Sequence, residues 1–349
     1  MSRRSDYGQV PKRKRGEKTV SETLCLVQQA AQRLVRELRR AEVWTVGWSN
    51  RQLAAGLLDA ALRRCLTTLA SSNCWGTSNE TLSHELWRIA GDWLKHGWLQ
   101  SRIREKPCGY PEDYELLQRI NDQTVCPDPL GRTFDDFFLK QAGAHALRQR
   151  SEFLASEISR CYLRRNPDAF HVLSFGCGPA TELQRFIQQI SLVQHASLRL
   201  TLVDPDTEAL NNARLRFHGQ VERSELVLCQ ENLYRMPERY PDIKLSAPVD
   251  FLICGGLFDY LSDAAARQML AFLFSCLASR GRMLVGNFSP HNPTRAYWEW
   301  IGNWYLNHRD QDSMRRIARD AGIAASDTRL LTDSSGVILF LDITRGETR

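Results

Sequence analysis

From residue 170 onward, short apolar runs alternate with segments of helical periodicity. The apolar runs are HVLSFG, LRLTLVD, ELVLCQ, VDFLICGG and GRMLVGNF, and between them lie TELQRFIQQI, TEALNNARLRF and SDAAARQMLAFLFSCLAS. This alternation predicts a parallel sheet joined by right-handed helical crossovers. TRLLTD and VILFLDITR then flank a Ser-Ser-Gly turn, which predicts a terminal antiparallel hairpin. We therefore expect an α/β domain with strands near residues 171–175, 199–203, 225–229, 249–254, 282–287, 328–332 and 337–343.

The first half of the chain has a different pattern. Residues 19–105 repeat apolar side chains at intervals of three and four, which predicts helices. Residues 106–135 are rich in Pro, Gly and Asp, and they predict a connecting region with a short helix in EDYELLQRI. A further helix is expected over about 136–164. The predicted parts are a disordered basic tail (1–18), a helical N-terminal domain (19–165) and the sheet domain (166–349).

Most of the net charge of +6 lies in the tail, where seven Lys and Arg residues oppose two acidic ones. Its stretch PKRKRGEK fits either a solvated segment or an arm that binds nucleic acid. The remainder of the chain is nearly neutral, which argues against a broad nucleic-acid footprint. We therefore expect a small-molecule partner and regard nucleic acid as the weaker candidate.

Composition also bears on the compartment. No apolar run approaches the about 18 residues of a membrane span, and the N-terminus shows no apolar signal region. The ten cysteines are scattered and form no Cys-x-x-Cys pair. We expect a reducing, cytoplasmic environment and no metal site.

Two glycines mark the first strand-to-helix turn of the expected sheet, in the sequence FGCGPATE. Gly176 and Gly178, which flank Cys177, allow a tight turn and let the backbone approach a ligand. A dinucleotide fingerprint requires a third Gly or Ala at position 181, where this chain has Thr181. A methyltransferase loop requires it at position 180, and Ala180 is a tolerable replacement.

The ends of the following strands add candidate cofactor contacts. Asp204 and Pro205 end the second strand, where a carboxylate can accept both ribose hydroxyls of a nucleoside. Glu231 and Asn232 follow the third strand near an expected adenine edge, and the pair Gly255 and Gly256 follows the fourth. With the terminal hairpin, these features indicate the Rossmann-like sheet of class I methyltransferases, with S-adenosyl-L-methionine as cofactor. The alternative is an α/β domain in which the glycines serve packing alone.

Four longer motifs extend the resemblance: KPCGYPEDYELL, FGCGPATE, GLFDYLSD and NFSPHNPTRAYWEWIGNWYLNHRD. Over about residues 105–345 the chain resembles the bacterial methyltransferases assigned to 3-hydroxypalmitic acid methyl ester, or extracellular factor, biosynthesis. The resemblance implies methyl transfer from S-adenosylmethionine to a small amphipathic acceptor, with carboxyl O-methylation of a 3-hydroxy fatty acid as its most specific form. One departure is Glu112, which stands where the family more often has glycine.

The segment 287–309 follows the fifth strand and is the predicted acceptor wall. Arg295 and Arg309 are candidates to hold a carboxylate by bidentate contacts, and His291 is a candidate base. The other candidate acceptor contacts are Asn287, Tyr297, Trp300, Trp304 and Tyr305. The aromatic residues are expected on a helix over 297–305, with Tyr297, Trp300 and Trp304 on one face. The alternative is that this face packs against the N-terminal domain.

The motif GYPEDYE is a candidate lid over the cofactor. Tyr110 and Tyr114 are four residues apart and face one way if helical, and Asp113 is a candidate partner for the methionine amino group. Tyr110 is assigned to the acceptor site, and Tyr114 joins His291 and Arg309 as a candidate catalytic residue. The alternative is a turn capped by Asp113.

Three other functions fit the same sequence. The first is N-methylation of an amine or amino-acid-derived metabolite, for which turnover rises with pH, whereas carboxyl methylation is flat above about pH 6. The second is RNA methylation that uses the basic N-terminal arm. The third is regulatory binding of S-adenosylmethionine without transfer.

Overall fold

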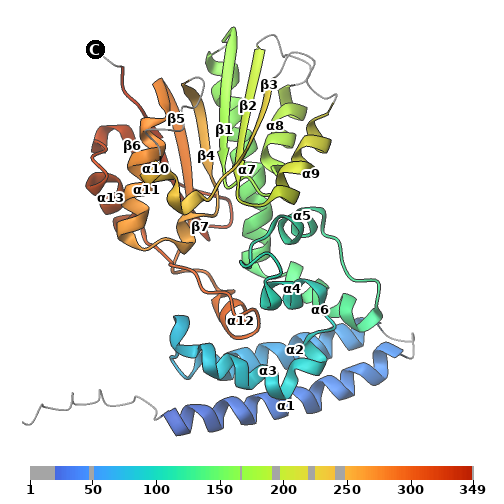
Figure 1. Cartoon of the computed structure of the whole chain (residues 1–349). Helices are drawn as coiled ribbons and strands as arrows, with labels where there is room; N and C mark the ends of the chain where they lie inside the picture. Colours follow the sequence, from blue (N-terminus) through green and yellow to red (C-terminus); the bar gives the residue numbers. More distant parts are fainter. Residues whose placement is uncertain are drawn as a thin grey trace, which may run out of the picture.

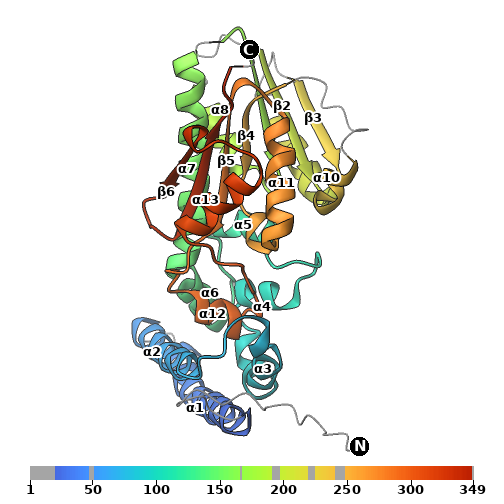
Figure 2. The same ribbon diagram turned by 90° about the vertical axis from the view of Figure 1, so that its left-hand side faces the viewer.

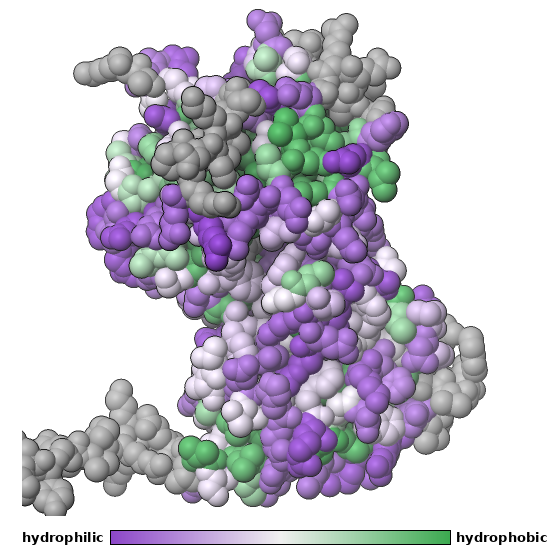
Figure 3. Space-filling view, viewed as in Figure 1, coloured by the Kyte–Doolittle hydropathy of each residue, from purple (hydrophilic) through white to green (hydrophobic). Residues whose placement is uncertain are grey.

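The computed structural model describes residues 20–46, 51–165, 167–190, 197–218, 225–239 and 248–347. The predicted basic tail, residues 1–18, lies outside these ranges. Figure 1 shows a sheet lobe above a helical lobe, and Figure 2 shows the same two lobes from the side. On the face drawn in Figure 3 they form one continuous, mostly hydrophilic body that narrows between them. Within the ranges described, no helix combines the length and apolar character needed to cross a membrane.

The helical lobe begins with α1 (Val20–Val46) and α2 (Arg51–Ala70), which pack against each other. It continues with η1 (Gly76–Asn79), α3 (Glu80–Leu94) and α4 (Trp98–Glu105). Val27, Ala31, Leu34 and Leu38 of α1 are buried, as their three- and four-residue spacing requires. The prediction of helices over 19–105 is therefore confirmed for the described residues.

Three helices connect the lobes: α5 (Tyr114–Asp122), α6 (Pro129–Leu139) and α7 (Ala142–Arg165). The single helix predicted over 136–164 is wrong, because α6 begins earlier and ends before α7. Asp128 caps α6 by accepting from the Gly131 N–H, with Pro129 in the first turn. At the start of α7, the Gly143 N–H donates to Thr294 Oγ1 at 2.7 Å, and the Trp298 ring occupies the place of a Cβ. This distant contact was not visible in the local sequence.

The described residues form a sheet of seven strands in the order β3-β2-β1-β4-β5-β7-β6. The strands are β1 (Ala169–Phe175), β2 (Ser197–Asp204), β3 (Glu225–Gln230), β4 (Val249–Cys254), β5 (Leu277–Phe288), β6 (Thr328–Thr332) and β7 (Ile338–Thr344). Strands β1 to β5 are parallel, while β7 runs antiparallel to both β5 and β6. The predicted strands and terminal hairpin are confirmed, and this is the Rossmann-like sheet of the class I methyltransferase fold. The strand order reverses between β1 and β4.

Helices cover both faces of the sheet. One face carries α7, α8 (Thr181–Ile190) and α9 (Thr207–Phe217), and the other carries α10 (Met236–Arg239), α11 (Asp263–Ser275) and α13 (Gln311–Asp320). In β1, Phe170 and Val172 join the first core, while Leu173 and Phe175 join the second. This period of two is that of a strand buried on both faces. Short turns η2 (Leu233–Arg235), η3 (Phe258–Tyr260) and η4 (Ala325–Asp327) complete the sheet lobe.

A segment after β5 leaves the sheet and reaches the helical lobe (Figure 1). It contains α12 (Arg295–Trp300), which packs against α2 and α3. The helix predicted over 297–305 is wrong, because α12 ends at Trp300. A Cβ at Gly302 would lie 2.8 Å from the Ile103 side chain, and Asn303 has φ of 50°, so the chain turns away from helical geometry here.

Candidate functional site

A cavity of about 330 Å³ lies at the carboxyl ends of β1, β2 and β4. This is the point where the strand order reverses, at which open parallel sheets bind ligands. The segment between α4 and α5 covers it. The lining comprises Cys108, Gly109, Tyr110, Glu112, Leu117, Asn121, Arg150, Ser151, Leu154, Ser174, Gly176, Cys177, Gly178, Pro179, Glu182, Asp204, Pro205, Leu233, Tyr234, Gly255, Gly256, Leu257 and Tyr260.

The predicted glycine turn forms one wall of this cavity. Gly176 and Gly178 have φ of 70° and 46°, the left-handed region that favours glycine, and Ala180 follows at 50°. The Gly176 N–H donates to Val203 O at 2.8 Å, which ties the turn to the end of β2. The turn therefore exposes backbone, with little side chain, to the cavity.

Asp204 clamps that turn from β2. Its Oδ2 accepts from the Gly178 N–H at 2.8 Å, and its Oδ1 accepts from the Asp206 N–H at 3.0 Å. Burial raises the pKa of this carboxyl, while the two backbone donors favour its charged form. Each oxygen keeps a further lone pair, so Asp204 can accept hydroxyl groups from a ligand in the cavity.

At the opposite end of the cavity lies a cluster that the sequence did not reveal. Glu112 Oε1 accepts from Arg150 Nη2 at 2.5 Å, and Oε2 accepts from the Tyr260 hydroxyl at 3.2 Å. Arg150 Nη1 also donates to Gly255 O at 3.3 Å. A Cβ at Gly256 would lie 2.7 Å from Glu112 Oε1, so this glycine makes room for the cluster.

One signal for Arg150 was present in the sequence. Leu147, Arg150 and Leu154 are spaced by three and four, so Arg150 lies on a face of α7 that is otherwise apolar. A charged residue at such a position needs a buried partner. The sequence distinguishes its partner, Glu112, only as a departure from the family pattern.

Some residues of the lid motif GYPEDYE line the cavity, while others make contacts outside it. Tyr110 lines the cavity, and burial raises the pKa of its hydroxyl. Asp113 does not line it, because this buried carboxylate caps α5 through the Leu116 N–H and pairs with Arg102 at 2.9 Å. The Tyr114 hydroxyl donates to Glu208 Oε2 at 3.2 Å, outside the lining.

The two residues predicted to contact adenine lie next to the described cavity lining rather than in it. Glu231 and Asn232 are not among the described lining residues, and the Asn232 side chain caps η2 by accepting from the Tyr234 N–H. Leu233 and Tyr234, which follow them, do line the cavity.

The aromatic residues after β5 lie outside the described cavity lining and join the two lobes. The Tyr297 hydroxyl donates to Gln100 Oε1 at 2.5 Å, and the Tyr305 hydroxyl donates to Asn79 Oδ1 at 2.7 Å. Trp300 is fully buried. Trp304 stacks on Trp298, and its Nε1 donates to the Tyr260 hydroxyl at 2.8 Å. Their placement favours the packing interpretation, and Trp304 donates its hydrogen bond to a residue that lines the cavity.

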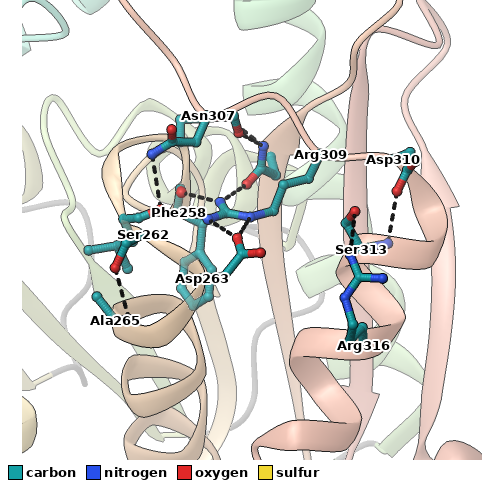
Figure 4. Close-up of polar contacts among 12 residues, drawn as sticks. Phe258, Ser262, Asp263, Ala265, Asn307, Arg309, Asp310, Ser313 and Arg316 are labelled. Atoms are coloured by element: carbon teal, nitrogen blue, oxygen red, sulfur yellow. Dashed lines mark hydrogen bonds and ion pairs between the residues drawn. The ribbon is translucent and has the colours of Figure 1, made fainter. Parts of the chain in front are cut away.

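The predicted polar residues of this segment are also absent from the described lining. Arg295 pairs with Glu299 and lies over the Trp75 ring, and His291 is exposed on a turn. Figure 4 shows the Arg309 guanidinium enclosed by its partners. Arg309 donates to Phe258 O, Leu261 O, Asn287 Oδ1 and Asp263 Oδ1 at 2.5 to 3.0 Å. Arg309 and Asn287 therefore hold the loops after β4 and β5 together.

Comparison with known proteins concerns the fold. No protein-family model matches the chain, and no curated protein matches its sequence. A possible exported protein from Bordetella parapertussis has a similar structure, with 16% identity, a TM-score of 0.55, and 94% of this chain and 97% of that chain covered. Magnesium protoporphyrin IX methyltransferase from Synechocystis PCC 6803, with bound S-adenosylhomocysteine, has 14% identity, a TM-score of 0.47, and coverage of 71% and 100%. An O-methyltransferase family protein from Burkholderia thailandensis has 16% identity, a TM-score of 0.45, and coverage of 74% and 73%.

Proposed function

We propose that this chain is an S-adenosylmethionine-dependent methyltransferase that acts on a small molecule. The observation that carries the proposal is the turn from Gly176 to Gly178, clamped to Asp204 at the point where the strand order reverses. A backbone turn beside a buried carboxylate suits a nucleoside, whose ribose hydroxyls donate to the carboxylate.

The lining residues fit the rest of this cofactor. Arg150 is the guanidinium in the described lining and suits the methionine carboxylate by a charge-assisted contact. Asn121 Oδ1 is buried without a hydrogen-bond partner, and it suits a donor on the ligand. When bound, S-adenosylmethionine supplies an electrophilic methyl group on a sulfonium. The protein positions the acceptor, excludes water and stabilises charge, as such transfer requires.

The acceptor is a small molecule because the cavity lies between the sheet edge and a covering segment. A volume of about 330 Å³ is within the range of small-molecule sites. The fatty-acid carboxylate implied by the family resemblance remains a prediction, but its two arginine anchors, Arg295 and Arg309, are engaged elsewhere. RNA methylation also remains a prediction, since the basic arm lies outside the described residues.

The proposal is tested by incubating the full chain with methyl-labelled S-adenosylmethionine and a bacterial cell extract. The label should enter a small-molecule fraction. Label in RNA that disappears when residues 1–18 are deleted supports the RNA alternative instead. Binding of S-adenosylmethionine without label in any fraction supports a regulatory protein.

A further inference from the structure

We propose that Glu112 selects the acceptor, and that the acceptor is an amine. The inference rests on the proposed function, because it concerns Glu112, which lines the same cavity and pairs there with Arg150. It is based on the charge balance of the lining and on the hydrogen bonds that hold Glu112.

The cavity carries an excess of negative charge. Of the described side chains that line it, Glu112, Glu182 and Asp204 are carboxylates, and Arg150 alone is a guanidinium. Burial raises the pKa of both Glu182 and Asp204, which disfavours their charged forms, and a cation bound in the cavity would oppose that effect. S-adenosylmethionine brings one net positive charge, from a sulfonium, an ammonium and a carboxylate. Even with this cofactor, the lining keeps an excess of negative charge that a cation would balance.

Hydrogen bonding around Glu112 leaves acceptor atoms facing the cavity. The Tyr260 hydroxyl keeps its proton, because burial and the nearby Glu112 carboxylate raise its pKa well above the usual value. That proton is donated to Glu112, while the Tyr260 oxygen accepts from Trp304 Nε1. Tyr260 therefore has no hydrogen to offer an acceptor carboxylate, whereas Glu112 can accept from an N–H group.

Arg150 connects cofactor binding to the charge of Glu112. In the structure Arg150 compensates Glu112 across 2.5 Å. A methionine carboxylate that pairs with Arg150 competes for the same guanidinium, so Glu112 then carries charge that Arg150 no longer fully balances. The side chain is only about a tenth exposed or less, and a charge so placed favours a positively charged neighbour.

The chemistry of amine methylation matches this arrangement. The amine first loses a proton to water, and its neutral nitrogen then attacks the methyl carbon. The N–C bond forms as the C–S bond breaks, the bonding pair stays on sulfur as a neutral thioether, and the positive charge moves to nitrogen. Glu112 accepts a hydrogen bond from the N–H and stabilises the developing ammonium. A carboxylate acceptor would instead yield a neutral ester, and its own charge would be repelled by Glu112.

Glu112→Gln tests the proposal, because it keeps the size and the acceptor oxygen while removing the charge. Glu115→Gln is the matched control, since Glu115 belongs to the same region but pairs with Arg102 and Arg119 outside the described lining. Each protein is titrated with S-adenosylmethionine by calorimetry, and is then incubated with methyl-labelled cofactor and a bacterial small-molecule extract. The product is finally treated with alkali, which releases methanol from methyl esters but leaves N-methyl groups intact.

We expect alkali-stable label from the wild-type chain and from Glu115→Gln, formed faster as pH rises from 6 toward 8 because the neutral amine becomes more abundant. Methyl transfer by Glu112→Gln should be at least tenfold slower than by the wild-type chain, while its affinity for S-adenosylmethionine should fall by no more than about threefold, because Arg150 is then free for the methionine carboxylate. Methanol release, or absence of transfer by a wild-type chain that binds the cofactor, overturns the amine proposal. A tenfold loss of cofactor affinity in Glu112→Gln assigns Glu112 to the methionine end and also overturns it. A wild-type chain that binds no S-adenosylmethionine overturns the proposed function itself.

Discussion

Gly255 and Gly256 are neighbours in sequence, but the structure gives them different surroundings. A Cβ at Gly256 would lie 2.7 Å from Glu112 Oε1 and 2.9 Å from Arg150 Nη1, whereas at Gly255 the nearest atom would be 3.5 Å away. Gly256→Ala should therefore displace the ends of the Glu112 and Arg150 side chains. We expect methyl transfer to fall by about tenfold or more, as small displacements at a reaction site do. Steady-state kinetics checks this.

Gly255→Ala is the control, because its added methyl group makes only ordinary contacts. It should keep most of the activity, and both variants should show the circular dichroism of the wild-type chain. Equal activity in the two variants would contradict a role of the Glu112–Arg150 pair in methyl transfer.

The sequence motifs identify individual residues on one side of the cavity, the side formed by the glycine turn and the end of β2. Gly176, Gly178 and Asp204 belong to a single strand-turn-helix unit and the adjacent strand, so local pattern was sufficient. The other half depends on Glu112, Arg150 and Tyr260, which come from the lid, α7 and η3. No local pattern shows that side chains so far apart in sequence converge.

At the scale of elements, Arg309 joins the loops that follow β4 and β5. Its guanidinium donates hydrogen bonds to Phe258 O and Leu261 O near η3 and to Asn287 Oδ1 at the end of β5. Figure 4 shows these contacts around Arg309. Arg309→Ala removes the donor to the buried Asn287 Oδ1 and leaves Phe258 O and Leu261 O with one donor each, the Leu261 N–H and Asn307 Nδ2. The loss of these charge-assisted hydrogen bonds should lower the free energy of unfolding by about 3 kcal/mol. Urea denaturation measures this.

Arg316→Ala provides the comparison, because Arg316 is exposed on α13 and donates to Ser313 Oγ, which also lies on that helix (Figure 4). It should change the unfolding free energy by less than about 0.5 kcal/mol. The folded Arg309→Ala chain should retain its affinity for S-adenosylmethionine. If the Arg309→Ala chain were as stable as the wild-type chain and had a higher KM for the acceptor, the result would favour the carboxylate-binding role predicted from the sequence.

Strands were easier to predict than the limits of the helices. The apolar runs of β1, β2, β4 and β5 follow from burial on both faces, a property of the run itself, while β3 is half-buried at the edge of the sheet. The ends of α7 and α12 depend instead on where other elements lie. Gly143 admits the Trp298 ring, and Gly302 approaches Ile103 of α4. Both helices end or begin at contacts between lobes, which periodicity does not encode.

At the scale of the molecule, His308 makes stability depend on pH. It lies in the segment that connects α12 with the sheet lobe, and burial, with the nearby Arg295, lowers its pKa to about 4. Because the folded pKa lies below the unfolded value of about 6.5, the stabilisation is complete above pH 6.5 and declines as pH falls toward 4. We expect His308 to lower the free energy of unfolding by about 1–2 kcal/mol when the pH falls from 7.5 to 5.

His308→Gln isolates that contribution, because the remaining titratable groups, including the carboxyl groups, are the same in both proteins. Denaturation midpoints at the two pH values should differ less in the variant than in the wild-type chain. The same pH dependence in both would show that His308 is not held in its neutral form.

The central claim is that the cavity at the edge of the sheet binds S-adenosylmethionine, and calorimetric titration of the wild-type chain and Asp204→Ala tests it most directly. Asp310→Ala is a matched control, because the Asp310 carboxylate likewise accepts from a backbone N–H, that of Ser313, but lies outside the described cavity lining. We predict one site per chain, and a loss of about 1.5–3 kcal/mol of binding free energy in Asp204→Ala, the scale of hydrogen bonds to a charged group. Asp310→Ala should bind as the wild-type chain does. Undiminished affinity in a folded Asp204→Ala chain, or no binding by the wild-type chain, would contradict the account.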